Sequence, residues 1–401
     1  MAEWIETLLS DILVDKGYIR GPFGSALKRG DMKEDGIPVY EQQHAIYNSR
    51  DFRYYIDKQK FNEMKRYQVR KDDLIISCSG TVGKVSIIKD DDPKGIISQA
   101  LLLLRADTNK ILPLYLKYFF SSRDGYNAIV SRSSGSVQVN IAKRSVIEQI
   151  PLKLPQIKIQ RKIVGVLSSI DEKIEENKRI NNNLLEQVQT LYHNRFIDTV
   201  NNERKICRAD EYFDISIGKT PPRKEPQWFS TNPQDFTWVS ISDMKSCGLY
   251  ISSSSEQLTK DAVDRHNVKV VPDNTVLLSF KLTVGRIAIT NGEMTTNEAI
   301  AHFKTNKKEI NEYLYCYLKC FNYQTMGSTS SIATAVNSKI IKGMPFVVPT
   351  DKELKEFHDF AAPIFAKIKA TQIETDNLAT LRDTLLPKLM SGELDVSDID
   401  I

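Results

Sequence analysis

The chain carries one series of residues twice, and this internal duplication limits the folds that it can adopt. The run 73–77 followed by 81–87 matches the run 275–279 followed by 283–289, with Gly83 corresponding to Gly285. Further matches keep the same order along the chain: 99–101 with 298–300, 114–120 with 313–319, and 151–155 with 345–349. Chance similarity rarely preserves order over so long a stretch, and small length changes in loops explain the drift in spacing. We therefore infer two copies of one domain.

Both copies show the same sequence of expected elements. Short β-branched runs predict strands at 74–78, 85–89 and 96–105 in the first copy, and at 276–280 and 286–290 in the second. A helix is expected next (112–121; 310–321), then a Ser- and Gly-rich loop (131–136; 327–331). A Pro-x-x-x-Pro unit is expected to close each domain, because proline fits poorly inside a sheet or a helix.

Each copy is followed by a stretch that predicts one long helix. Residues 158–196 contain no proline, and a heptad spacing of mostly apolar residues predicts a coiled-coil seam. About 38 residues would span roughly 57 Å, so we expect the two helices to pair with each other, antiparallel. Pro363 is expected to bend or restart the second helix. The predicted seam consists of Ile163, Leu167, Ile170, Ile174, Asn177, Leu184 and Leu191 in the first helix, and Phe357, Ile364, Ile368, Leu378 and Leu385 in the second.

The middle of the predicted seam is polar in both helices. Asn177 and Asn181 occupy it in the first helix, and Thr371 and Thr375 occupy it in the second. Buried polar groups cost stability but fix the register of a helix pair. Alternatively, these residues face solvent where the helices diverge, and the sequence leaves both interpretations open.

Composition restricts where a binding signal can lie. The formal net charge is only +4, from 55 Lys and Arg against 51 Asp and Glu, so any DNA-binding signal must come from local patches. The chain has five cysteines and no C-x-x-C pair; Cys316 and Cys320 are expected to be core thiols, which fits a reducing compartment. The acidic residues near the N-terminus argue against a signal peptide, and no apolar run is long enough for a membrane span, so we expect the cytoplasm.

The sequence lacks the motifs of a DNA methyltransferase and of a phosphate-binding loop, and it shows no metal-ligand pattern. A methyltransferase needs Asn/Asp-Pro-Pro-aromatic, and the nearest string, 232–235, lacks the second proline and the aromatic residue. A phosphate-binding loop would need glycine and Ser/Thr at the positions of Cys78 and Val85. The five histidines show no metal-ligand spacing. We therefore expect no catalytic residue, no metal site and no cofactor in this chain.

Two long motifs resemble those of the specificity subunits of type I restriction-modification enzymes. The run 155–177 looks like the central conserved region of that family, and 381–394 looks like its distal conserved region. The resemblance implies an α+β protein with two target recognition domains (1–157 and 201–351) and two conserved spacer helices (158–200 and 352–396). It also implies a bipartite double-stranded DNA target, one half for each domain, and a gap that the helices set. Two methyltransferase subunits that use S-adenosylmethionine would dock on the helices, and restriction subunits that use ATP and Mg would join them. Residues 359–365 depart from the first helix, so the pseudo-symmetry is imperfect there.

Basic and amide side chains in the loops of both domains are the candidate DNA-binding residues. Cations would position the backbone, and amides or arginines would read base edges. Lys84 and Arg286 are the strongest cation candidates because the duplication keeps a cation at both places. Taken singly, each of the others could equally be a solvated loop residue. The full set is Arg20, Lys28, Arg29, Gln42, Gln43, Lys84, Arg132, Ser134 and Gln138 in the first domain, and Lys219, Arg223, Lys224, Lys245, Lys281, Arg286 and Ser330 in the second.

Two other functions compete with DNA specificity. A stand-alone DNA-modifying enzyme would transfer methyl groups as the purified chain, and a coiled-coil adaptor would bind no duplex DNA. The missing motifs and the chain length argue against the enzyme, and a filter-binding assay with duplex DNA separates the adaptor from a specificity subunit.

Overall fold

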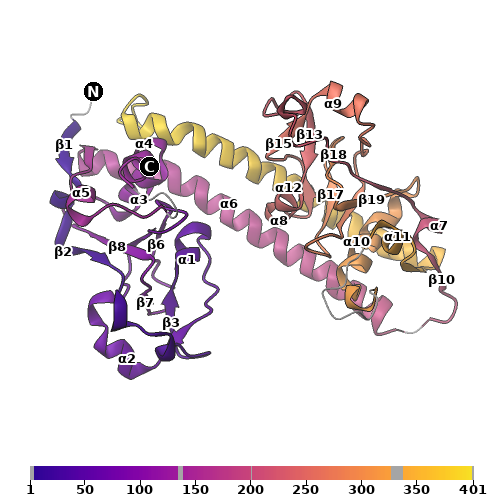
Figure 1. Cartoon of the computed structure of the whole chain (residues 1–401), viewed down its shortest axis with the longest axis horizontal. Helices are drawn as coiled ribbons and strands as arrows, with labels where there is room; N and C mark the ends of the chain where they lie inside the picture. Colours follow the sequence, from indigo (N-terminus) through magenta and orange to yellow (C-terminus); the bar gives the residue numbers. More distant parts are fainter. Residues whose placement is uncertain (1–3, 134–138, 200, 327–336, 400–401) are drawn as a thin grey trace. The chain divides into compact units, whose positions relative to one another are not determined.

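The structure is a computed structural model that describes residues 4–133, 139–199, 201–326 and 337–399. The chain divides into two compact units (Figure 1). The first unit consists of Met1–Ile174 with Leu378–Ile401, and the second of Glu175–Asn377. Each unit therefore contains one part of each of the two long helices, α6 (Ile157–Tyr192) and α12 (Asp351–Ser391).

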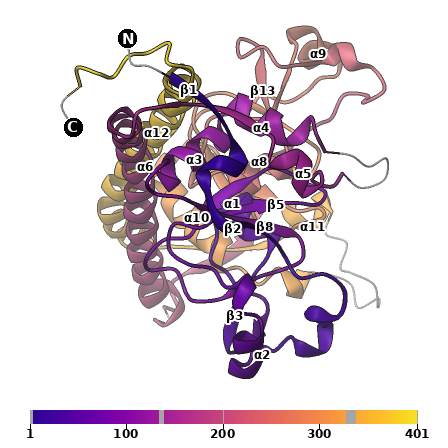
Figure 2. The ribbon, with the colours of Figure 1, turned by 90° about the vertical axis from the view of Figure 1, so that its left-hand side faces the viewer.

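A four-stranded antiparallel sheet of order β2-β8-β5-β6 forms the centre of the first unit (Figure 2). A smaller sheet has the order β4-β3-β7, and β1 pairs with β9. The strands are β1 (Trp4–Leu8), β2 (Leu13–Arg20), β3 (Ile37–Tyr40), β4 (Tyr55–Ile56), β5 (Leu74–Ser77), β6 (Val85–Ile87), β7 (Ile96–Ile97), β8 (Leu101–Ala106) and β9 (Pro151–Pro155). Besides α6, the helices are α1 (Gln42–Tyr47), α2 (Lys58–Glu63), α3 (Pro113–Ser121), α4 (Arg123–Val130) and α5 (Arg144–Ile147), with 3-10 turns η1 (Leu9–Ile12), η2 (Gly24–Ala26), η3 (Arg29–Asp31) and η4 (Lys65–Tyr67).

The second unit is built in the same way around a five-stranded sheet of order β11-β19-β16-β17-β14. A second sheet has the order β12-β15-β13-β18, and β10 pairs with β20. The strands are β10 (Lys205–Arg208), β11 (Asp214–Ile217), β12 (Phe229–Ser230), β13 (Phe236–Val239), β14 (Tyr250–Ile251), β15 (Glu256–Leu258), β16 (Val276–Ser279), β17 (Ile287–Thr290), β18 (Thr295–Thr296), β19 (Ile300–Lys304) and β20 (Pro345–Val348). The helical segments besides α12 are η5 (His193–Ile197), α7 (Ala209–Tyr212), η6 (Pro226–Trp228), α8 (Ile241–Ser246), α9 (Lys260–Arg265), η7 (Lys308–Ile310), α10 (Asn311–Cys320), η8 (Tyr323–Met326) and α11 (Ser338–Lys342).

Strand pairing confirms the duplication and the predicted α+β fold. The order β2-β8-β5-β6 in the first unit corresponds to β11-β19-β16-β17 in the second. The parallel pair β3 and β7 corresponds to the parallel pair β13 and β18. The antiparallel pair β1 and β9 corresponds to β10 and β20. The helices expected at 112–121 and 310–321 are α3 and α10, and both contribute buried side chains to the cores of their units.

Two expectations about strands are wrong. The single strand expected at 96–105 is two strands, since β7 pairs with β3 whereas β8 enters the central sheet. The break falls at 98–100, where the half-buried Ser98 and the exposed Gln99 interrupt two buried apolar runs, a signal that the single-strand expectation overlooks. The Pro-x-x-x-Pro units do not merely close the domains: the first forms β9, and the second forms β20 and ends one residue after it. In β9 the two prolines pair with the terminal residues Trp4 and Leu8 of β1, where a missing N–H interrupts no central ladder.

The long helices are confirmed, but α12 does not restart at Pro363. It runs without interruption for 41 residues, and α6 runs for 36. A proline inside a helix leaves the carbonyl four residues earlier without its partner. Both Pro363 and Asp359 are exposed, so water can solvate that carbonyl. Apolar side chains on the opposite face, such as Ala361 and Phe365, are buried and hold the helix together.

Within each unit the two helices contact each other along the predicted seam. In the first unit, Ile163 and Leu167 of α6 share a core with Leu386 and Leu389 of α12. In the second unit, the part of α6 around Val188 shares a core with the part of α12 from Phe357 to Ile368. The N-terminal part of α6 thus contacts the C-terminal part of α12 in the first unit, and the C-terminal part of α6 contacts the N-terminal part of α12 in the second, as expected for an antiparallel pair. Supercoiling of the pair remains a prediction.

Of the polar residues of the seam, Asn177 and Thr371 are buried within the helix pair, and Asn181 and Thr375 are half-buried. Asn177 is 1% exposed and its amide nitrogen donates to Glu374 at 3.1 Å. The amide nitrogen of Asn181 donates to the backbone oxygen of Ile368 at 3.4 Å, and Thr371 is buried. Of the two interpretations left open by the sequence, the structure supports the buried one, in which polar groups fix the register.

Asp171 of α6 connects three elements of the first unit. Its carboxylate accepts hydrogen bonds from the Tyr118 hydroxyl at 2.8 Å, Lys117 at 3.3 Å and Arg382 of α12 at 2.9 Å. Burial alone would raise the pKa of Asp171, but Lys117, Arg382 and Tyr118 together hold it below its ordinary value. Replacement of Asp171 by alanine would leave Lys117 and Tyr118 without this acceptor.

We expect Asp171→Ala to lower the free energy of unfolding by about 2–4 kcal/mol, because it removes one partner of a largely buried ion network. Chemical denaturation followed by circular dichroism measures this. Asp383→Ala is the matched control, since Asp383 binds the same Arg382 at 2.8 Å but is 65% exposed; we expect a loss below about 1 kcal/mol. Because the folded-state pKa of Asp171 is lowered, its contribution is present above the ordinary aspartate pKa and is lost as the pH falls below it. Equal losses in the two variants would contradict the central role of Asp171.

Candidate nucleic-acid interface

The turn between β5 and β6 carries the first of the two cations that the duplication keeps. The backbone N–H of Gly83 donates to the backbone oxygen of Ser77 at 2.9 Å, and the N–H of Lys84 donates to the Ser77 hydroxyl at 3.0 Å. Gly83 has φ +86°, in the region that favours glycine. The turn is therefore held by one buried serine, and it places Lys84 immediately before β6.

The turn between β16 and β17 repeats this arrangement in the second unit. Gly285 donates to the backbone oxygen of Ser279 at 3.0 Å, Arg286 donates to the Ser279 hydroxyl at 3.0 Å, and Gly285 has φ +90°. The glycine contacts also correspond, because a Cβ would meet Tyr126 at Gly83 and Tyr323 at Gly285. The two cations thus occupy the same position on the same turn.

The side chains of the two cations have different surroundings. The exposed Lys84 has its ammonium 4.9 Å from the ring centroid of Tyr126. Arg286 is half-buried and donates one N–H to the backbone oxygen of Ile241 at 2.6 Å. A guanidinium carries five donors, so this bond positions Arg286 and leaves other donors for a ligand.

The amides of Gln42 and Gln43, candidates for reading base edges, make hydrogen bonds within the first unit. The Gln42 amide nitrogen donates to the backbone oxygen of Ser79 at 2.6 Å, and its oxygen accepts from the Ser79 N–H at 3.0 Å. The Gln43 amide nitrogen donates to the backbone oxygen of Asp51 at 3.1 Å. Gln42 therefore fastens the N-terminus of α1 to the β5–β6 turn, so the structure brings Gln42 and Lys84 to one end of the sheet.

The remaining described candidates of the first unit lie on β2, on the turns after it and in the turn that follows α4. Arg20 ends β2, is half-buried, and lies 5.5 Å from the ring centroid of Phe23. Lys28 and Arg29 are exposed around η3. One guanidinium nitrogen of Arg132 donates to the backbone oxygen of Ala128 at 2.8 Å. Ser134 and Gln138 lie outside the described residues, as do residues 134–136 of the expected Ser- and Gly-rich loop.

Arg223 of the second unit is fixed by an ion pair and two aromatic rings. Two of its nitrogens donate to the Glu256 carboxylate, both at 2.9 Å. Its guanidinium carbon lies 4.2 Å from the ring centroid of Phe229 and 4.6 Å from that of Trp238. Sequence reasoning placed this residue in a loop but did not predict these partners, which come from other strands.

The other cations of the second unit are exposed lysines. The Lys219 ammonium donates to the backbone oxygen of His266 at 2.6 Å. Lys281 lies in the β16–β17 turn, and the positive charges of Lys281 and Arg223 both favour the ionised form of Glu298. Burial alone would raise the pKa of Glu298, but the Thr220 hydroxyl, its backbone and these cations lower it. Lys224 and Lys245 are exposed as well, and Ser330 lies outside the described residues.

Sequence reasoning missed Leu282, which is in the same turn as Lys281. Its side chain is 100% exposed. The alignment of the two copies could have identified it, because Leu282 corresponds to Gly80 of the first copy.

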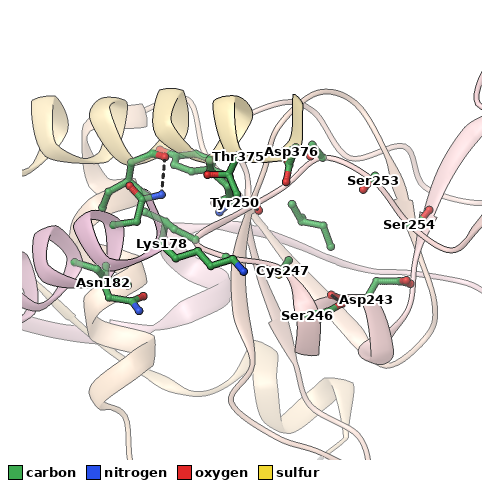
Figure 3. Close-up of a pocket in the computed structure, with 18 of the residues that line it drawn as sticks. Lys178, Asn182, Asp243, Ser246, Cys247, Tyr250, Ser253, Ser254, Thr375 and Asp376 are labelled. Atoms are coloured by element: carbon green, nitrogen blue, oxygen red, sulfur yellow. Dashed lines mark hydrogen bonds between the residues drawn. The ribbon is translucent and has the colours of Figure 1, made fainter. Parts of the chain in front are cut away.

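A cavity of about 490 Å³ lies in the second unit between the helices and the β14 region (Figure 3). Lys178 and Asn182 line it from α6, Thr375 and Asp376 from α12, and Cys247 from the segment after α8. Burial raises the pKa of the Cys247 thiol to about 11, so it is not a reactive thiolate.

Within the described ranges, no group of three or more His, Cys, Asp or Glu side chains is placed to hold a metal ion. None of the helices in the part of the chain that the structure describes combines the length and apolar character that a bilayer span requires.

Comparison with known proteins agrees with the two-copy architecture. A family model described as the type I restriction modification DNA specificity domain matches residues 24–186 and again residues 201–378. The HindI specificity subunit from Haemophilus influenzae is 20% identical over 390 residues, which covers 78% of this chain and 84% of that protein. The MjaIX specificity subunit from Methanocaldococcus jannaschii is 25% identical over 309 residues, covering 71% and 70%.

One solved structure supports the fold. The crystal structure of the type I restriction-modification S subunit from M. genitalium has a TM-score of 0.55 and 15% sequence identity. The match covers 97% of this chain and 96% of that chain.

Proposed function

The chain belongs to the type I restriction-modification DNA specificity family, and from this premise we propose that it reads a bipartite DNA target as a specificity subunit. The recognition domains would be residues 1–157 and 201–351, each reading one half of the target. One observation carries the proposal: each domain has the same serine-braced turn with a cation at its end, Lys84 in one and Arg286 in the other. Such a cation would position the DNA backbone beside the side chains that read base edges.

The helices 158–200 and 352–396 would set the gap between the two half-sites and bind two methyltransferase subunits. Apolar side chains form the outer parts of the seam and are buried within each unit, and buried polar groups at its middle fix the register, which supports a stiff spacer. Apolar side chains also remain exposed on α12, including Phe360, Ile373 and Leu381, and these would be available to partner subunits.

The chemistry would belong to those partners and not to this chain. The methyltransferase subunits would bind S-adenosylmethionine, and restriction subunits would use ATP and Mg. The specificity subunit would contribute binding and orientation alone, in the cytoplasm where its DNA target lies.

Insertion of four residues into each helix at facing positions, after Arg179 and after Gln372, is expected to widen the gap in the target by one or two base pairs. Four residues lengthen a helix by about 6 Å and rotate its far end by about 40°. One added base pair lengthens DNA by about 3.4 Å and rotates it by roughly 34°, so the two changes are compatible. Methylome sequencing of a strain that expresses this chain with its methyltransferase measures the gap.

The matched control inserts four residues between Glu34 and Asp35, in an exposed turn of the first domain. This insertion should leave the gap unchanged. A target with an unaltered gap after the helix insertion would exclude the spacer role, and the absence of sequence-specific methylation with the unmodified chain would refute the proposed function itself.

A further inference from the structure

Leu282 combines an apolar side chain with complete exposure to water. It is 100% exposed, whereas the next most exposed large apolar residue in the described part of the chain, Ile206, is 71% exposed. Leucine is a residue that proteins usually bury. The free protein therefore gains no packing from this side chain.

The backbone at Leu282 is also unfavourable for leucine. Leu282 has φ +60°, and the N–H of Thr283 donates to the backbone oxygen of Lys281 at 2.6 Å, which closes a three-residue turn around it. Turns of this kind with a positive φ are rare and strained for residues other than glycine. Gly80 has φ +66° at the corresponding position of the first unit, where a glycine carries no such strain.

The tip of this turn is held in place by Ser279. The fully buried Ser279 hydroxyl donates to the backbone oxygen of Thr283 at 2.6 Å and accepts from Arg286 at 3.0 Å. The N–H of Phe280 donates to the backbone oxygen of Ala299 at 2.9 Å. A strained residue that persists on a braced turn is characteristic of functional sites.

The charges around Leu282 suit a polyanion. Lys281 precedes it and is exposed, and Arg286 follows on the same turn. Lys281 and Arg223 both lie near enough to Glu298 to lower its pKa. In DNA, phosphates bind cations, whereas base stacks and thymine methyl groups offer apolar surface.

We infer that Leu282 makes an apolar contact with the bases of the half-site read by the second recognition domain, either between stacked base pairs or against a thymine methyl group. The inference rests on the proposed function and adds a specificity-determining residue to it. Burial of this side chain against bases would also explain why leucine is kept where the first copy has glycine.

The test uses the full complex with its methyltransferase subunits and duplexes that contain its target. One set of duplexes carries 2-aminopurine at successive positions of this half-site, and a second set replaces each thymine by uracil, which lacks the methyl group. We expect either a fluorescence increase at one base step or a loss of affinity at one uracil, and we expect Leu282→Gly to abolish that response. A base flipped by the methyltransferase also raises fluorescence, but its signal does not depend on Leu282.

Leu282→Gly should weaken specific binding about ten- to hundred-fold and leave nonspecific binding unchanged, because the cations remain. Its Tm should equal or exceed that of the wild type, since glycine removes the strain, so the loss cannot come from unfolding. Ile206→Ala is the control and should not change affinity. Selective binding that is equal in the wild type and in Leu282→Gly, with both probes unaffected, would overturn this inference alone. A wild-type complex that binds no duplex selectively would overturn the proposed function and the inference together.

Discussion

Exchange of residues 1–157 for the first recognition domain of another specificity subunit is expected to change one half of the DNA target completely and to leave the other half unaltered. The two units have separate apolar cores, one containing the sheet of β2, β5, β6 and β8 and the other the sheet of β11, β16, β17 and β19. Because specific binding typically exceeds nonspecific binding by roughly 10³–10⁷, methylation of the original target should fall below detection. Methylome sequencing of strains that carry the wild type and the exchanged chain gives the result directly.

The structure also determines how this exchange must be made. Residues 4–8 pair with 151–155 in a two-stranded sheet, so both strands have to come from the same donor. The donor must also supply equivalents of Lys117 and Tyr118, which bind Asp171 of the retained helix. The reciprocal exchange of 201–351 is the control and should alter the other half-site. A change in both halves after either exchange would show that the domains do not read DNA independently.

Much of the fold could be predicted because its signals are periodic and repeated. The heptad seam predicted α6 and α12. Because each motif occurs twice, the same strands and helices could be predicted in both copies. The division of 96–105 into β7 and β8 is marked only by the short polar step Ser98-Gln99, and reasoning from periodicity joins the two buried apolar runs on either side of it. The continuity of α12 through Pro363 depends on burial of the opposite face, which the local sequence does not encode.

The correspondence of the two candidate cations could be predicted, but their surroundings could not. The duplication pointed to Lys84 and Arg286, and the structure places both on equivalent turns. The bonds between Gln42 and Ser79 join residues 37 apart in sequence, and short-range reasoning cannot find such a pair. A positive φ at Leu282 contradicts the ordinary preference of leucine, so only the comparison with Gly80 indicates it.

Phe357→Ala in α12 is expected to lower the free energy of unfolding of the second unit by about 3–5 kcal/mol. Phe357 is 0% exposed, and its ring lies 5.5 Å from that of Phe196, 6.0 Å from that of Tyr192 and 6.5 Å from that of Tyr313, measured between centroids. Alanine would leave a cavity in this aromatic cluster, which joins α6, α10 and α12, and the rigid surroundings could close it only in part.

Phe360→Ala is a matched control on the same helix, because Phe360 is 42% exposed. We expect it to cost less than about 1 kcal/mol. Hydrogen exchange of residues 175–377 measures both variants without requiring that the whole chain unfold in one step. Since Phe357 belongs to the seam, its loss should also loosen the contact of α12 with α6 in this unit and so weaken the spacer. Similar protection in both variants would mean that the aromatic cluster is not what holds α12 to α6.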